Sequence, residues 1–417
     1  MPAVVGGGLG DIAEVLDAGR ELAGAGFPST LYRPADRPLP RSVDGPWDFR
    51  GIRRAPVLRP RAARALTVTP NWGVSAAPDR PGPLGRGGSW ATEAETIEWA
   101  YGGAATLHVS LEEFARTLTS AEENAERWRE GGETAAATVE RRRTAEFRGD
   151  AAQFHRDFRT FRGFDRPNVL HVFQTFRPRS AFAREFPESI QVGPIWPARP
   201  LGRSPTERIE STEWVWYASP SSSDALVDEI DRGLRATGVR RIVVRSPRPL
   251  RLPSGSGVEW VPERPMEPAE WSRRFAAAGV RIVTGSRTLL EALAVGGPFL
   301  YFNGVLAGGR RRHRHRPEKV QALVRAWRAM GVPERIRRDV DDFSRGRRVA
   351  EVVRTAATDR DWSRRFPRSS PVGGFPAHRR DGGAYLVDVA RAFATGSDSA
   401  PDLVRRLRAE GRGSGRR

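Results

Sequence analysis

The chain alternates short apolar runs with amphipathic segments, and this alternation is clearest between residues 213 and 302. Apolar runs bounded by turn residues predict buried strands at 214–217, 241–244, 258–261, 280–283 and 299–302. Apolar residues that recur every three or four positions predict helices over 224–237, 268–277 and 287–295. Strands that alternate with helices in this way indicate an α/β fold, with a parallel sheet and helices on both of its faces.

The first half of the chain follows the same alternation less regularly. It opens with an apolar run at 3–5 and a glycine-rich turn, and a helix follows whose apolar positions include Ile12, Val15 and Leu22. Further strands are predicted at 29–33, 66–69, 106–109, 168–173 and 189–192. The stretch 34–60 is dense in proline and arginine and has no period, so we predict a loop there.

A proline-rich segment at 193–205 divides the chain. Prolines remove amide donors and fix an extended path, which suits a connection between domains. We therefore predict two Rossmann-like α/β domains with parallel sheets that face a cleft, over 1–195 and 196–345. Helices are predicted over 346–395. The charged, Gly/Ser-rich stretch 396–417 is expected to be a disordered tail.

Composition narrows the function classes. The 417 residues are 39% hydrophobic, which excludes a wholly disordered chain, and the absence of cysteine excludes disulfides and a cysteine nucleophile. A net charge of +19 attracts phosphates, nucleic acid or an anionic membrane surface. Lys319 is the only lysine, however, so nearly all of the positive charge comes from arginine. A GC-rich genome also produces such a preference for arginine over lysine, which weakens the argument for a selected basic surface.

The chain is expected to be cytoplasmic, with peripheral membrane contact as an option. Its start has neither a basic segment nor a long apolar segment of the secretory kind. The long apolar stretch 289–309 is interrupted by Glu291, by Gly297-Pro298 and by Asn303, so it reads as helix, turn and strand rather than a membrane span.

The segment 280–294 carries the strongest site signal. A predicted strand ends at Val283, small residues follow, and a helix begins with Ser286 or Thr288 near its cap, so free amides and the positive helix dipole meet at the sheet edge. That arrangement suits a phosphate, and Glu291, one turn later, can accept two hydrogen bonds from ribose hydroxyls. The alternative is structural: Ser286 caps the helix, and Glu291 is a favourable acid near its start.

This stretch and the apolar strand after it resemble the donor half of the GT-B glycosyltransferases. The pattern is most similar to nucleotide-sugar transferases such as the lipid-linked N-acetylglucosaminyltransferase of peptidoglycan synthesis, and it covers 213–302. The resemblance implies a nucleotide-sugar donor, no cofactor and no metal. It implies donor-binding roles for Gly285, Ser286, Arg287, Thr288, Glu291, Val261, Met266, Ser221 and Ser222. Of these, Val261 and Met266 would line the base, and Glu291 would bind the ribose.

The N-terminal glycine-rich loop fits the same family less closely. The resemblance implies that Gly7 and Gly8 face the donor or the acceptor and that Asp11 is the general base, although Asp11 is also a sound helix cap. Gly8, Gly10 and Ala13 also match a loose dinucleotide fingerprint. No acid ends the second strand, where such a site needs one.

Two further regions carry candidate residues. The loop after 299–302 contains Asn303 and the basic run from Arg310, where the resembled families hold acid or Gln residues. In one interpretation, Asn303 and Arg310 bind the sugar or an anion. In the other, the basic run is a charged surface that is exposed to solvent. His171 lies in an apolar strand, where it is either a cleft-edge catalytic residue or a packed core histidine. The histidines show no metal-ligand spacing.

Together these patterns predict a metal-independent glycosyltransferase acting on an unknown acceptor, which is lipid-linked or anionic. A nucleotide-sugar epimerase or hydrolase on the same scaffold is the enzymatic alternative. An arginine-rich nucleic-acid-binding protein is the non-enzymatic one. The scatter of the basic residues and the lack of a motif interleaved with aromatics argue against it.

Overall fold

The computed structural model divides the chain into two compact units. It describes residues 10–32, 52–55, 64–70, 95–102, 167–174, 188–196, 211–218, 222–246, 249–263, 268–302, 318–367 and 381–414. The first unit contains Met1–Asp44, Phe49–Ile195 and Ala377–Arg417, and the second contains Gly45–Asp48 and Trp196–Pro376. Apart from Gly45–Asp48, the chain therefore passes from the first unit to the second after Ile195 and returns at Ala377.

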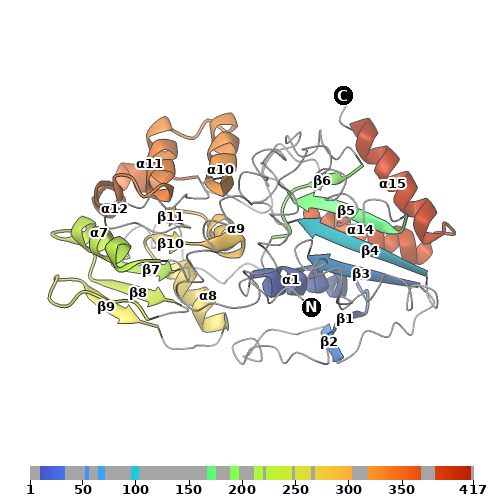
Figure 1. Cartoon of the computed structure of the whole chain (residues 1–417), viewed down its shortest axis with the longest axis horizontal. Coiled ribbons are helices and arrows are strands. Elements are labelled where there is room, and N and C mark those ends of the chain that lie inside the picture. The colour runs from blue at the N-terminus through green and yellow to red at the C-terminus, as the bar shows by residue number, and fades with distance from the viewer. Residues whose placement is uncertain are drawn as a thin grey trace, which may run out of the picture. The chain divides into compact units, whose positions relative to one another are not determined.

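The second unit is built on a five-stranded parallel sheet (Figure 1). Its strands are β7 (Glu213–Tyr217), β8 (Arg241–Arg245), β9 (Glu259–Pro262), β10 (Arg281–Val283) and β11 (Phe299–Tyr301). Their order across the sheet is β11-β10-β7-β8-β9. The chain thus starts in the centre, winds outward to β9, and then returns past β7 to build the other half, as in Rossmann-like sheets. The predicted parallel α/β architecture is confirmed for this unit.

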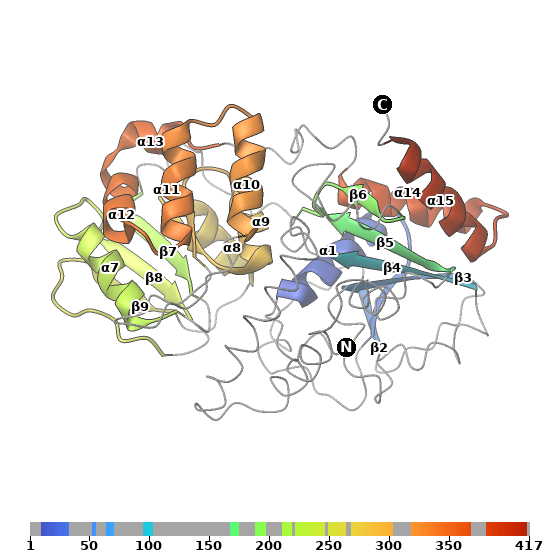
Figure 2. The same cartoon turned by 45° about the horizontal axis from the view of Figure 1, so that its top comes forward.

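Helices cover both faces of this sheet. They are α7 (Asp224–Leu234), α8 (Pro268–Ala277), α9 (Gly285–Val295), α10 (Glu318–Ala329), α11 (Glu334–Ser344), α12 (Val349–Thr358) and α13 (Arg360–Arg364). The right-handed crossover rule places α7 on one face and α8 and α9 on the other. Helix α12 packs on α7 (Figure 2), and Gly233 allows the approach, because a Cβ there would lie 2.6 Å from the Ala350 carbonyl oxygen.

The core of the second unit contains polar groups with defined partners. Trp214 and Trp216 of β7 are fully buried, and the indole Nε1 of Trp260 donates to buried Asp231 at 3.1 Å. Trp362 Nε1 likewise donates to buried Asp339 at 3.1 Å. Each carboxylate satisfies a donor that burial would otherwise leave unpaired, at a cost of about 1–3 kcal/mol.

Arg281 is fully buried and joins the ends of two helices. Its guanidinium donates to the carbonyl oxygens of Phe275, Ala276 and Ala278 at the end of α8, and to those of Gly296 and Pro298 after α9. A cation is favourable there, because the carbonyls at a helix C-terminus carry partial negative charge. An arginine at the start of β10 therefore fixes both helices of this face to the strand between them.

The first unit contains a four-stranded parallel sheet and a separate parallel pair. The larger sheet has the order β3 (Arg64–Pro70), β4 (Glu95–Gly102), β5 (Val169–Gln174) and β6 (Ile190–Val192), and the pair is β1 (Ser29–Tyr32) with β2 (Ile52–Ala55). Strand β2 lies inside 34–60, so the prediction of an uninterrupted loop there was wrong. The part of that stretch that the structure describes is the four-residue strand itself, which is too short to produce a clear pattern in the sequence.

The helices of the first unit come from both ends of the chain. Helix α1 (Gly10–Gly24) packs against α14 (Gly382–Thr395), and α15 (Ala400–Ser414) contacts β4, β5 and β6. Figure 2 shows α14 and α15 with this sheet. The stretch 396–417, expected to be a disordered tail, therefore contains a packed helix. Its composition is charged, yet Leu403, Val404 and Leu407 form an apolar stripe that is buried in the core of the unit.

Within the part of the chain that the structure describes, no helix is both long enough and apolar enough to cross a membrane.

Candidate functional site

The carboxyl edge of the five-stranded sheet holds the switch in strand order. β7 and β10 are neighbours in the sheet, but the chain leaves them toward helices on opposite faces. In open α/β sheets, ligands bind outside the carboxyl ends of the strands at this point. Here β7 ends at Tyr217, and β10 ends at Val283 and continues directly into α9.

The start of α9 differs from the sequence expectation. The helix begins at Gly285, with φ of +76°, and Thr284 is its N-cap, so Ser286 lies inside the first turn instead of at the cap. Thr288 is buried, and its hydroxyl donates to the carbonyl oxygen of Thr284. That donor is therefore used within the helix. The backbone N–H groups of the first turn remain as the candidate anion donors.

The helices differ in whether a side chain caps their first turn: α7 and α9 at this edge have no such cap, and neither do α11 and α12. In α13 and α14, the side chains of Asp359 and Asp381 accept a hydrogen bond from a first-turn amide. In α7 and α9, the N-cap residues Ser223 and Thr284 make no such side-chain bond. The first turn of α9 also contains no acidic residue. An anion at α9 would thus meet helix amides without competition from a capping carboxylate.

Glu291, the predicted ribose ligand, is ion-paired on the same helix. Arg287 Nε donates to Glu291 Oε1 at 3.0 Å, and the two side chains are 13% and 26% exposed. This spacing of four residues places both on one face of α9. Two residues that were each predicted to bind the donor are thus ion-paired with one another, and one carboxylate oxygen is already in use.

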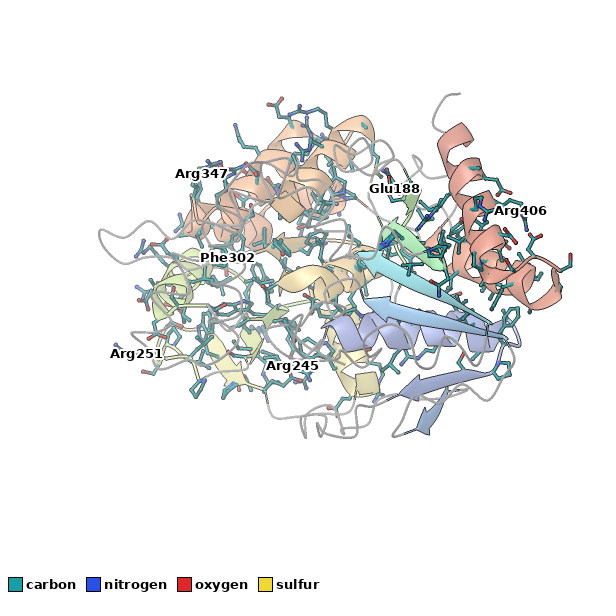
Figure 3. All side chains as sticks on the ribbon, turned by 45° about the vertical axis from the view of Figure 1, so that its right-hand side comes forward. Glu188, Arg245, Arg251, Phe302, Arg347 and Arg406 are labelled. Atoms are coloured by element: carbon teal, nitrogen blue, oxygen red, sulfur yellow. The ribbon has the colours of Figure 1, made fainter. Side chains whose placement is uncertain are left out.

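A second group of residues at this edge was missed by the sequence reasoning. Tyr217 and Arg245 are direct partners at the ends of β7 and β8, and the amide of Glu263, just after β9, donates to the Val244 carbonyl oxygen at 2.8 Å. The three therefore form a row across adjacent strands. We call Tyr217, Arg245 and Glu263 the edge row. Figure 3 labels Arg245.

Helix α8 covers the edge row. The Arg245 guanidinium lies 5.0 Å from the ring centre of Trp271, and the Tyr217 ring lies 6.3 Å from the same indole. A cation over an indole face is attracted by the ring quadrupole. The row is thus held from one side by an aromatic residue of α8.

Two members of the edge row, Glu263 and Tyr217, have raised pKa values, and burial is the main cause of both shifts. Burial raises the pKa of Glu263 to about 7, although the guanidinium groups of Arg245 and Arg274 act to lower it. Burial also raises the pKa of Tyr217, where Arg245 acts in the opposite direction and Glu291 and Glu263 add to the increase. The charges of the row and of Glu291 on α9 therefore act on the same phenol. Perturbed groups clustered at a ligand-binding edge are typical of functional sites.

The other residues predicted for the site lie in both units or outside the described residues. Val261 is a half-buried residue of β9, and Ser222 directly precedes the cap of α7. Asp11 is the second residue of α1, and fully buried His171 lies in β5, both in the first unit. Neighbours Leu170 and Val172 belong to the core cluster, so His171 points to the other sheet face. The predicted residues outside the described residues are Gly7, Gly8, Ser221, Met266, Asn303 and Arg310.

The edge row left only a weak signal in the sequence. Each member is a polar residue at the end of an apolar run, but only the strand order shows that the three runs are neighbours. Among the residues that the structure describes, no group of three or more His, Asp or Glu could hold a metal ion. No protein-family model matches the chain, and no curated protein matches it either.

Proposed function

We propose that the second unit binds the nucleotide part of a nucleotide-diphosphate sugar at the carboxyl edge of its sheet, and that the protein transfers the sugar to an acceptor. The observation that carries this proposal is the start of α9. It lies at the switch in strand order, lacks a side-chain cap, and carries Glu291 one turn later. Two Rossmann-like domains of the GT-B kind are the architecture that this proposal implies.

The diphosphate would lie against the first turn of α9. Backbone N–H groups and the positive end of the helix dipole stabilise an anion there, and Gly285 brings the backbone close because it has no side chain. Arg287 and Glu291 follow on the same helix face. Glu291 would accept a hydrogen bond from a ribose hydroxyl with the oxygen that Arg287 does not engage.

The reaction would be metal-independent. When the bond from the sugar to the diphosphate breaks, negative charge develops on the leaving diphosphate, and preorganised amides at a helix start stabilise such charge without reorganisation. The acceptor hydroxyl must lose a proton as it attacks the sugar carbon. Asp11 of the first unit is proposed as the base that takes this proton.

A nucleotide-binding screen tests the proposal most directly. UDP, GDP and ADP are titrated into the full chain by calorimetry, and thermal unfolding is followed in parallel. A ligand that binds only the folded protein at 100 times its Kd stabilises it by about 2.7 kcal/mol. Binding of none of these diphosphates would reject the proposed function.

Incubation of the protein with labelled nucleotide sugars separates transfer from the enzymatic alternatives. An epimerase or hydrolase converts the donor in the absence of any acceptor, whereas a transferase requires one. Titration with single- and double-stranded nucleic acid at several salt concentrations tests the non-enzymatic alternative. That reading predicts affinity that falls steeply with salt.

A further inference from the structure

Glu263 has a buried carboxylate that receives no hydrogen bond from the described residues. Both of its oxygens are inaccessible to solvent and unpartnered, although its backbone amide is bonded to β8. A buried polar group without a partner is costly, and such groups in folded proteins have a reason to be there. Glu263 directly follows β9 at the edge of the sheet where we propose that a nucleotide binds. A bound ligand would provide that reason.

Two guanidinium groups near Glu263 favour its ionised form, although burial outweighs them and raises the pKa of Glu263 to about 7. Arg245 belongs to β8, and Arg274 and Glu270 belong to α8. The two guanidinium groups attract the carboxylate and Glu270 repels it, while Tyr217 of β7 lies within the same field. Among the described residues, the acceptor capacity of this carboxylate is therefore unused.

We propose that Glu263 accepts paired N–H groups from the base of the bound nucleotide, and that this base is guanine. This inference rests on the proposed nucleotide site and adds the identity of the base. A carboxylate offers two acceptors side by side. Guanine presents two adjacent donors, the ring N1–H and the exocyclic amine, on its Watson–Crick edge.

The other bases fit an ionised Glu263 less well. Uracil offers one N–H between two carbonyl oxygens, and those oxygens repel a carboxylate. Adenine and cytosine each place an amine next to a ring nitrogen that is itself an acceptor. They would need a protonated Glu263, and at pH 8, above its raised pKa of about 7, that form is the minority.

The distance across the sheet suits one nucleotide. From β10, which leads into α9, to β9 there are three strand spacings, since β7 and β8 lie between them. At about 4.8 Å per spacing, the span is about 14 Å. An extended nucleoside diphosphate of this length can place its phosphates at the start of α9, its ribose near Glu291 and its base at Glu263.

The pH dependence of GDP binding tests this inference on the wild-type protein alone. With the pKa of Glu263 raised to about 7, part of the protein carries a protonated Glu263 at neutral pH. Guanine needs the ionised form, so GDP affinity should rise with pH up to about 7 and level off above it, by at most about tenfold per pH unit. GDP affinity that is constant between pH 6 and 8 would overturn the inference.

Glu263→Gln supplies the second test, with Glu259→Gln as its matched control. Glu259 is the first residue of β9, the strand that ends just before Glu263. It is 62% exposed and pairs with Arg241 at the surface. Calorimetry with GDP, UDP and ADP at pH 8 measures the affinities of all three proteins. A bidentate pair with a base gives about 5- to 150-fold discrimination, so the wild type and E259Q should prefer GDP by that factor.

E263Q should lose this preference, because an amide offers one acceptor and turns a donor toward guanine. A wild type that binds UDP or ADP as tightly as GDP, or an E263Q protein that keeps the GDP preference, would reject guanine recognition while leaving the nucleotide site intact. Failure of all three diphosphates to bind the wild type would reject the proposed function itself.

Discussion

Arg287 donates from Nε to Oε1 of Glu291 at 3.0 Å, across one turn of α9. The sequence suggested that Glu291 offers two oxygens to a pair of ribose hydroxyls. With Oε1 engaged by Arg287, the second oxygen is the one that would be left for the proposed ligand. The ion pair also limits the freedom of both side chains, which lowers the cost of ordering them when a nucleotide binds.

Glu291→Ala should weaken nucleoside diphosphate binding by about 1–3 kcal/mol, because a charged hydrogen-bond partner of the ribose is lost. Calorimetry with the tightest diphosphate measures the change. Glu334→Ala is a suitable control, since Glu334 lies in the first turn of another helix, α11, and is exposed. Affinity that stays at the wild-type value in a folded E291A protein would remove Glu291 from the site.

The part of the candidate site around α9 could be predicted from the sequence, because the residues that form it are contiguous in the chain. An apolar strand, small residues and an amphipathic helix are contiguous between Val280 and Val295, so no tertiary information is needed. The helix start was placed late, because Gly285 adopts a positive φ that lets the helix follow Thr284 directly. The edge row could not be predicted in this way. Tyr217, Arg245 and Glu263 meet only because β7, β8 and β9 are adjacent.

Asp11→Asn should lower the rate of sugar transfer while leaving donor affinity unchanged. The substitution keeps the size of the side chain and removes its basicity, and general base catalysis typically contributes 10²- to 10⁴-fold. Turnover with a labelled donor and an acceptor extract measures the rate, and calorimetry measures donor binding. Asn is also a good residue at a helix start, so the fold of α1 should not change.

Full transferase activity of D11N would refute the assignment of the base. Glu14→Gln serves as the matched control, because Glu14 lies one turn further along the same helix. Loss of donor affinity in D11N would give Asp11 a binding role instead of a proton-transfer role.

Glu263→Gln should stabilise the ligand-free protein above neutral pH. The pKa of Glu263 is raised to about 7 in the folded state from 4.5 in the unfolded chain. Between these values the folded form holds more protons, so stability falls as pH rises through this window, and the penalty is constant above pH 7. The variant removes the penalty. Both carboxylate oxygens are inaccessible to solvent, but the residue as a whole is half-buried, so we discount the gain to about 1 kcal/mol for solvent screening.

Urea unfolding of the wild type and E263Q at pH 5 and pH 8 measures this effect. The difference between the two proteins should be small at pH 5 and largest at pH 8. Equal stability of both proteins at pH 8 would show that the carboxylate is not held in a desolvated place. A binding residue that costs stability is a common compromise in functional sites.

The C-terminal stretch 396–417 shows how amino-acid composition can wrongly predict disorder when a helix has few apolar residues. Charge and glycine predicted a frayed tail, and three apolar residues in α15 were too few to outweigh them. These residues recur at helical spacing and meet strands from the middle of the chain, a contact that no local window contains. Arg408 reinforces the docking, since its Nη2 donates to the Val169 carbonyl oxygen at 2.8 Å.

Leu403→Ala should therefore destabilise the first unit. Leu403 is fully buried among residues of α14, β5 and β6, and removing a buried leucine side chain costs about 2–5 kcal/mol. Arg405→Ala on the same helix is the control, because Arg405 is 77% exposed and surface substitutions usually change stability by less than about 0.5 kcal/mol. Thermal and urea unfolding of both variants measure the difference. If L403A unfolds at the same urea concentration as R405A, α15 does not hold the first unit together, and the composition-based expectation of a frayed tail was the better one.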